Sequence, residues 1–298
     1  MRDGHDHSSG GSRALALALV LTASYTAVEV VGGVLTGSLA LLADAVHMLS
    51  DNVAIALALV AVWLAGKPAT PERTYGYKRA EVLAALANGV TLVALSIWIF
   101  YAAAQRLDDP PDVLGGWMLV IALAGVGVNV AAGVILSRER AGGLNVEAAF
   151  RHVLADLLGS VGVVIAAVTI LATGWLVVDP LVSVLIGVLV LVSSWTILRD
   201  STSILLEAAP IGVDTRAVGE RLARAPGVVE VHDLHIWTIT SGFPALSAHV
   251  LVGAGEDCHA RRQELEQLLR REFAVEHTTL QVEHARDRDA LVEIQRLT

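Results

Sequence analysis

Cysteine is almost absent from this chain, since Cys258 is the single thiol among 298 residues. One thiol excludes an internal disulfide framework and a zinc site built from several cysteines. Charged residues are also scarce, at 17% of the chain, whereas a soluble domain carries roughly a quarter. The formal net charge of −9 argues against a nucleic-acid partner, because nucleic-acid-binding proteins favour basic surfaces.

Hydrophobic residues take the place of the missing charges: they make up 54% of the chain, with a mean hydropathy of +0.61, and they concentrate in its first two-thirds. A helix needs about 20 residues to cross the hydrocarbon core of a bilayer. We therefore expect a disordered polar leader at residues 1–12, an α-helical polytopic transmembrane domain at 13–200 and a cytosolic domain at 201–298. The six expected transmembrane helices are Arg13–Leu35, Ser38–Ala65, Ala80–Gln105, Gly116–Ser137, Leu144–Thr173 and Leu176–Leu198.

Basic residues in the short loops predict the orientation. Between the second and third helices, between the fourth and fifth, and after the sixth lie most of the loop cations, whereas the opposite loops offer only Arg106. The positive-inside rule therefore places both termini in the cytoplasm. An Ala- and Arg-rich composition is typical of a bacterial source, which makes the membrane the cytoplasmic one. The cations are Lys67, Arg73, Lys78, Arg79, Arg138, Arg140 and Arg199.

Two histidine–aspartate pairs interrupt the second and fifth apolar runs, so both runs should score poorly for hydropathy. His47 precedes Asp51 by four residues, and His152 precedes Asp156 by the same spacing. Residues four apart lie on one helix face. Ionisable groups at such depth are costly and usually functional. Two imidazoles and two carboxylates form a complete four-ligand set for a zinc-like ion.

The expected topology brings both pairs to a similar depth, because the second helix runs inward and the fifth runs outward. Transporter sites commonly lie at the bilayer midplane, so we expect the metal site there. Asp44, three residues before His47, can hold the second nitrogen of that imidazole or act as a polar packing group, and the sequence leaves both readings open. We expect interhelical hydrogen bonds from four other intramembrane polar residues: Glu29, Asn52, Asn88 and Asn129.

The last third of the chain changes character and becomes polar and amphipathic. Its pattern predicts the order αββαβ, which fits a small α+β domain of the ferredoxin-like kind. The histidines His232, His249 and His284 lie on or near the three expected strands, and their convergence at one sheet edge would form a regulatory metal site. The expected elements are helix Asp214–Arg224, strands Val228–Thr240 and Ala245–Val252, helix Glu256–Phe273 and strand His277–His284.

Four stretches together make the chain resemble the cation diffusion facilitators, a family of zinc-exporting proton antiporters. The resemblance implies six transmembrane helices, a cytosolic ferredoxin-like domain and a homodimer. It implies that His47, Asp51, His152 and Asp156 form the transport site, in the two-His, two-Asp version that accompanies zinc, often with cobalt or cadmium. The stretches are GSLALLADAVHMLSD (Gly37–Asp51), PERTYGYKRAEVLAALANG (Pro71–Gly89), HVLADLLGSVGV (His152–Val163) and VHDLHIWTITSG (Val231–Gly242).

The family's cytosolic metal site matches the histidines of the last third, with His259 as an additional ligand and His235 as an outer-shell candidate. Arg286 replaces the carboxylate expected two residues after His284. Asp287 is a candidate replacement, but a shift of one residue turns a side chain across a strand, so one metal or two remain open. Gly66–Tyr77 contains neither His nor Asp, and we expect the family's additional loop site to be missing.

Zinc ligands must be deprotonated, so protonation releases zinc, and imidazoles exchange protons near neutral pH. We therefore expect Zn²⁺ efflux by proton antiport, with His47 and His152 as proton carriers. A membrane metalloenzyme is disfavoured, because neither pair carries a nearby glutamate base of the HExxH kind. A membrane-tethered metal sensor is the remaining alternative, in which the cytosolic histidines are the functional site.

Overall fold

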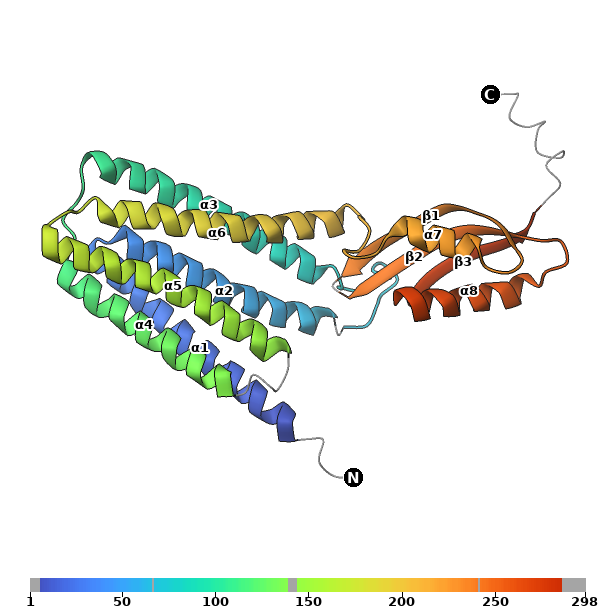
Figure 1. Ribbon diagram of the computed structural model, residues 1–298, viewed down its shortest axis with the longest axis horizontal. Coiled ribbons are helices and arrows are strands. Elements are labelled where there is room, and N and C mark those ends of the chain that lie inside the picture. Colours follow the sequence, from blue (N-terminus) through green and yellow to red (C-terminus); the bar gives the residue numbers. More distant parts are fainter. Residues whose placement is uncertain (1–5, 66, 139–143, 241, 286–298) are drawn as a thin grey trace. The chain divides into compact units, whose positions relative to one another are not determined.

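The structure, a computed structural model, describes residues 6–65, 67–138, 144–240 and 242–285. The chain divides into two compact units, and each is considered by itself. The first contains Met1–Val60 and Ala84–Leu198, and the second contains Ala61–Leu83 and Arg199–Thr298. Figure 1 labels their helices and strands in chain order.

Six long helices occupy the first two-thirds of the described chain, as the sequence predicts. Their bounds agree closely with the expected runs, except that α1 begins at Asp6, inside the expected leader, and α6 continues past Leu198. A formed helix can extend through polar residues, because each added residue gains one backbone hydrogen bond. The helices are α1 (Asp6–Thr36), α2 (Leu39–Ala65), α3 (Ala80–Asp108), α4 (Gly115–Arg138), α5 (Leu144–Thr173) and α6 (Val178–Leu205).

Five of these helices are long and apolar enough to cross a membrane over the described residues. The stretch Val153–Thr173 of α5 is among them, with a hydropathy of 2.3. The expectation that the fifth run would score poorly is therefore wrong, because the apolar residues after Asp156 outweigh that one charge. Large apolar side chains face outward along the helices, as suits elements that satisfy their backbone hydrogen bonds internally and meet lipid.

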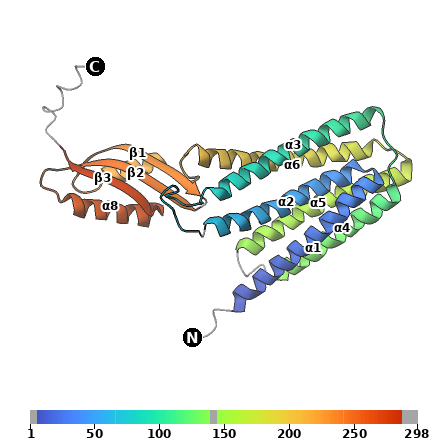
Figure 2. The ribbon, with the colours of Figure 1, turned by 180° about the vertical axis from the view of Figure 1, so that it is seen from behind.

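Helices α1 and α4 lie side by side (Figure 2), and glycines allow their close approach. A Cβ atom added at Gly32 would lie 2.4 Å from the Ile121 side chain, and one at Gly125 would lie 2.4 Å from the Tyr25 hydroxyl oxygen. Small residues at such crossings let helix backbones pack closely in lipid. The polar groups of α1 are thereby held against α4.

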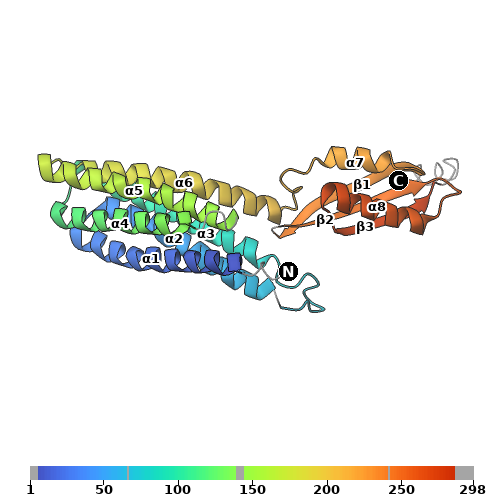
Figure 3. The same ribbon diagram turned by 60° about the horizontal axis from the view of Figure 1, so that its bottom comes forward.

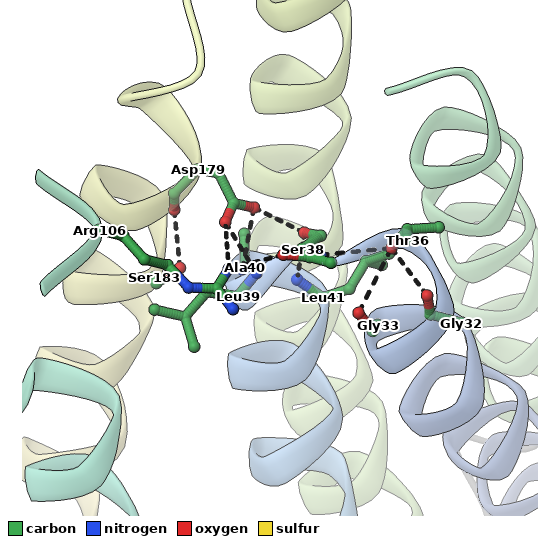
Figure 4. Close-up of polar contacts among 11 residues, drawn as sticks. Gly32, Gly33, Thr36, Ser38, Leu39, Ala40, Leu41, Arg106, Asp179 and Ser183 are labelled. Atoms are coloured by element: carbon green, nitrogen blue, oxygen red, sulfur yellow. Dashed lines mark hydrogen bonds and ion pairs between the residues drawn. The ribbon is translucent and has the colours of Figure 1, made fainter. Parts of the chain in front are cut away.

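A carboxylate from α6 caps the first turn of α2. The Asp179 carboxylate accepts hydrogen bonds from the Ser38 hydroxyl at 2.6 Å, the Leu39 backbone N–H at 2.8 Å and the Ala40 backbone N–H at 3.1 Å (Figure 4). The first N–H groups of a helix have no partner within the helix, and negative charge is favourable there. Asp179 is almost completely buried, so this contact fixes where α2 begins.

Arg106 at the end of α3 joins the same cap. Its guanidinium donates to the Gly37 carbonyl oxygen at 2.6 Å and lies 3.5 Å from the Asp179 carboxylate. Gly37 has a φ of +72°, a conformation that glycine adopts without steric cost. The turn between α1 and α2 is thus tied to both α3 and α6.

The second unit contains the predicted αββαβ order. Its elements are α7 (Thr215–Ala223), β1 (Val228–Thr240), β2 (Phe243–Val252), α8 (Cys258–Phe273) and β3 (His277–His284). In the sheet, β2 lies between β1, its antiparallel neighbour, and β3, its parallel neighbour. Helix α7 packs along β1 and α8 packs along β3 (Figure 3).

Alternation along β2 separates the two faces of the sheet. Ala248, Val250 and Val252 are buried in a core with Leu222 of α7 and Leu269 of α8. The residues between them point to the opposite face, because successive side chains of a strand alternate. Asp214 and Asp257 precede the two helices, and each carboxylate accepts two backbone N–H bonds as an N-cap.

Candidate metal centre

His47 and Asp51 lie one turn apart on α2, as their spacing predicts. The Nδ1 atom of His47 is 3.8 Å from Oδ2 of Asp51. The first turns of α2 are buried in the helix core, with Leu39, Ala40 and Leu41 fully covered. That packing and the Asp179 cap fix the rotation of α2 about its axis. Because His47 and Asp51 lie one turn apart, both side chains lie on the same face of the fixed helix.

Asp156 of α5 completes the described cluster. Its Oδ1 atom is 3.5 Å from the other ring nitrogen of His47, Nε2. One ligand atom from each of His47, Asp51 and Asp156 can be chosen so that all lie within 4.8 Å of one another. In the part of the chain that the structure describes, this is the one set of three or more such groups with that geometry.

His152 precedes Asp156 by one turn of α5, and residues four apart share a helix face. Its side chain lies outside the described part of the structure, so its role as a fourth ligand stays a prediction.

The cluster is closed on one side and open on the other. The Asp156 side chain is 6% exposed, whereas those of His47 and Asp51 are 23% and 29% exposed. A nitrogen and carboxylate donor set suits zinc-like ions, whereas all-oxygen sets suit magnesium or manganese. The arrangement can therefore hold a divalent cation.

Polar groups on neighbouring helices surround the cluster. Ser160, one turn after Asp156, donates its hydroxyl to Oδ2 of Asp44 at 3.1 Å, and Asn129 of α4 donates to Ser160 at 3.1 Å. Asp44 as a partner of the His47 ring therefore stays a prediction. Sequence reasoning missed Ser160, because nothing in its local pattern distinguishes it from other small residues in a membrane helix.

The three intramembrane asparagines make the expected interhelical bonds. Asn129 donates to Ser160, Asn52 donates to the Thr26 hydroxyl, and Asn88 donates to the Ser50 hydroxyl. Glu29 accepts a hydrogen bond from Tyr25 on its own helix, and its carboxyl group also lies within hydrogen-bonding reach of Asp44 on α2.

In the cytosolic domain, His232 and His249 are directly paired across β1 and β2. Their ring centroids are 5.4 Å apart in an edge-to-face arrangement. Asp233 has a φ of 52° beside an irregularity in the strand register, and its carboxylate lies 2.8 Å from His235 Nε2 and 3.9 Å from His249 Nε2. The hydrogen bond with His235 lowers the pKa of Asp233. These groups form a small cluster of imidazoles around one carboxylate.

His284 lies elsewhere on the sheet, paired with Val252 on β2. It is 3.6 Å from the Cys258 thiol and 2.9 Å from the Glu256 carbonyl oxygen. Because Val252 faces the helices and His249 faces the other side, alternation places His284 and His249 on opposite faces. Convergence of the three histidines therefore stays a prediction.

For two further residues expected at this cytosolic site, no described side-chain contact supports a role as metal ligands. His259 lies at the start of α8, where its backbone N–H donates to the Asp257 cap. Asp287 lies outside the described residues. The participation of both residues in a metal site stays a prediction.

Comparison with known proteins gives matches along nearly the whole chain. A family model of the cation efflux transmembrane domain matches residues 15–206, and one of the cytoplasmic domain of cation efflux proteins matches residues 210–285. A solved structure, the metal-bound C-terminal domain of the CzcD transporter from Cupriavidus metallidurans, is 38% identical. It covers 24% of this chain and 99% of its own, with a TM-score of 0.23.

Three relatives are 39% to 44% identical to this chain over most of their length. The metal cation efflux system protein CzcD of Cupriavidus metallidurans is 44% identical over 94% of this chain and 89% of its own. The zinc transporter ZitB of Escherichia coli is 42% identical over 95% and 93%. The cadmium, cobalt and zinc/H(+)-K(+) antiporter of Bacillus subtilis is 39% identical over 94% and 92%.

The helical bundle with its buried metal-ligand cluster, the small α+β domain and these matches agree with the resemblance found in the sequence. The chain therefore belongs to the cation efflux, or cation diffusion facilitator, family, and it is a multi-pass membrane transporter of divalent metal cations rather than an enzyme.

Proposed function

We propose that this chain exports Zn²⁺ from the cytoplasm across a bacterial cytoplasmic membrane in exchange for protons. The observation that carries the proposal is the meeting of His47, Asp51 and Asp156 from two helices within 4.8 Å. With His152 as the fourth ligand, the site is a tetrahedral two-His, two-Asp set at the bilayer midplane. Such a donor set suits zinc, and cobalt and cadmium are the expected competing cargoes.

The ligands themselves link zinc to protons. A histidine binds zinc only when its ring nitrogen is free of a proton, so metal binding releases protons and protonation releases metal. Two carboxylates offset the charge of the dication, which lowers the cost of holding it within the bilayer. Opening of the site alternately to each side of the membrane, by rocking of helices around it, then exchanges zinc for protons.

The names of the relatives support this reading. The Bacillus subtilis relative is named as a cadmium, cobalt and zinc/H(+)-K(+) antiporter, and the Escherichia coli relative as a zinc transporter. The excess of basic residues in the loops expected on the inside supports cytoplasmic termini.

The cytosolic domain binds metal and regulates transport in a homodimer. The pairing of His232 with His249 supports a metal site there, since two imidazoles on neighbouring strands with a carboxylate beside them are suitable zinc ligands. The same observation favours the alternative of a metal sensor whose helices serve as an anchor. Regulation requires that metal bound in this domain changes the equilibrium between transport states.

Zinc flux in proteoliposomes, with and without a pH gradient, tests the proposal. The wild-type protein should move zinc when a gradient is imposed, and Asp51→Ala should lower the flux at least about 100-fold, because even the loss of an outer-shell partner of a metal ligand costs 10–100-fold. Asp109→Ala is the matched control, since Asp109 is an exposed aspartate after α3. It should leave the flux unchanged.

A wild-type protein that binds zinc but moves none under any gradient would contradict the transporter proposal. A His47→Ala variant that moved no zinc yet still changed cytosolic signalling in response to metal would favour the sensor.

A further inference from the structure

A second acidic pair lies beside the candidate metal centre. Glu29 of α1 and Asp44 of α2 are each 1% exposed, and their carboxyl groups lie within hydrogen-bonding reach of each other. Neither residue belongs to the ligand set of the transport site. Two buried carboxylates at this separation cannot both be ionised at low cost, whereas one proton shared between them makes the contact attractive.

The hydrogen-bond donors around this pair are too few for two carboxylates. The Tyr25 hydroxyl lies 3.3 Å from Oε1 of Glu29, but it also lies 2.9 Å from the Ile121 carbonyl oxygen, and a hydroxyl has one proton to give. Ser160 donates to Oδ2 of Asp44. Over the described chain, Oε2 of Glu29 and Oδ1 of Asp44 remain buried without a hydrogen-bond partner.

No lysine or arginine compensates the pair from the neighbouring membrane stretches, since residues 16–36, 39–65, 115–137 and 153–173 contain neither. The titratable groups that face it are Tyr25 on α1, His47 on α2 and Asp156 on α5, and α4 presents the amide of Asn129. An unpaired buried charge is much more costly than a neutral hydrogen-bonded acid. These contacts therefore favour one proton bound between the two carboxyl groups.

The pair lies about one helical turn from the candidate ligands. Asp44 precedes His47 by three residues, and Ser160, which contacts Asp44, follows Asp156 by four. Residues at these spacings are about 5–6 Å apart on a helix surface. In a low-dielectric interior, a dication at that range strongly favours the loss of a nearby proton.

We propose that Glu29 and Asp44 together hold one exchangeable proton of the antiport cycle. The assignment rests on the function proposed above and names a proton site outside the ligand set. When the dication occupies the neighbouring site, the O–H bond of the shared proton breaks and the proton leaves to water, so that both carboxylates remain. Departure of the dication lets the pair regain the proton. Bound metal lowers the affinity for the proton by the same factor by which the bound proton lowers the affinity for metal.

A proton fits this place better than a second metal ion does. A metal would need several ligands around it, but the pair joins no third histidine, cysteine or carboxylate in a ligand-like set within the described residues. A proton needs no volume beyond the contact between the two carboxyl groups.

The number of protons released per zinc bound tests the inference. Isothermal titration calorimetry of the full-length protein in detergent, near neutral pH in buffers of different ionisation enthalpy, gives this number. Glu29→Gln should release about one proton fewer than the wild type, because the introduced side-chain amide donates its own hydrogen to Asp44 and the shared proton is lost. Zinc should still bind, with an affinity within about 100-fold of the wild-type value, since outer-shell changes typically cost 10–100-fold.

Tyr25→Phe is the matched control, because it removes a contact to Glu29 while both carboxyl groups stay. It should release as many protons as the wild type. Asp44→Asn should repeat the deficit of Glu29→Gln, and it carries the same expectation if Glu29→Gln does not fold.

Equal proton release in the wild type and in both acid variants would overturn the inference. A deficit in proton release that disappears when sodium or potassium ions are added would also overturn it. These outcomes are distinct from failure of the proposed function, which Asp51→Ala tests through the loss of zinc binding and flux. If Glu29→Gln released as many protons as the wild type and transported zinc normally, the transport site would be intact and the acid pair would hold no proton of the cycle.

Discussion

At the scale of single residues, charge decides what the membrane site can hold. His47 lies between the carboxylates of Asp51 and Asp156. A dication at this place meets two negative charges and the His47 imidazole, so the loaded site is nearly neutral. In the proposed antiport cycle, departure of the dication leaves an excess of negative charge that the proton of the Glu29–Asp44 pair offsets. Metal and proton then compete for the same excess of negative charge.

Cytosolic metal binding can be measured separately from the membrane site. In an Asp51→Ala background, His232→Ala and His249→Ala should each weaken zinc binding at least about tenfold, because each removes an imidazole ligand. Titration calorimetry of the full chain measures the affinity. His277→Ala is the control, since its ring lies against Tyr75 and Phe243; an effect of His277→Ala as large as that of the paired histidines would contradict this assignment.

The sequence predicts residues such as His47 and Asp51 because spacing within one helix determines their relative direction. It does not predict the contact of Glu29 with Asp44 or of Ser160 with Asp44, because those contacts depend on how helices are rotated and shifted against each other. The sequence also does not determine strand register, which pairs His284 with Val252, and the meeting of His232, His249 and His284 stays a prediction.

At the scale of elements, the position of α2 is fixed at its N-terminal end. Asp179 accepts bonds from Ser38, Leu39 and Ala40 and lies near Arg106. One buried carboxylate thus joins α2, α3 and α6. The lengths of the six helices followed from their apolar runs, but this cap did not, since Asp179 is 139 to 141 residues away from its partners in the sequence.

Removal of this cap should destabilise the helical bundle. Asp179→Ala leaves two backbone N–H groups and the Arg106 guanidinium without their acceptor, and loss of one partner of a buried ion pair typically costs about 3–5 kcal/mol. Thermal unfolding of the purified protein in detergent should show a lower midpoint, while Asp109→Ala should unfold like the wild type. Asp179→Asn keeps one carbonyl acceptor and should lie between the two. A midpoint unchanged in Asp179→Ala would show that the cap does not stabilise the bundle.

At the scale of the whole molecule, the chain joins a membrane unit to a unit that contains the C-terminal domain. The segment between α2 and α3 belongs to the second of these. Within that unit, Arg79 forms an ion pair with Glu207 at 3.0 Å, and Glu81 accepts a hydrogen bond from Thr240 at 2.9 Å. The helix that carries His47 and Asp51 therefore leads directly into a segment held by the cytosolic domain. In the proposed regulation, this continuity is the route by which metal bound in that domain would influence α2.

The side of the membrane that the C-terminal domain occupies decides which pool of metal its histidines can bind. Cys258, the single cysteine, is partly exposed at the start of α8 and serves as a native reporter. Because the positive-inside rule places this domain in the cytoplasm, a membrane-impermeant maleimide should label Cys258 in inverted vesicles but not in intact cells. Labelling is read by mass spectrometry of the purified protein.

A double variant, Cys258→Ala with Asp109→Cys, moves the only thiol to the loop expected on the outside and should reverse the pattern. Detergent-permeabilised cells should label both proteins, which shows that each thiol is reactive. Labelling of Cys258 in intact cells would place the C-terminal domain outside. In the proposed antiport, an inward proton gradient drives zinc outward in either orientation, so the labelling pattern decides whether the C-terminal histidines meet cytoplasmic metal, not the direction of transport.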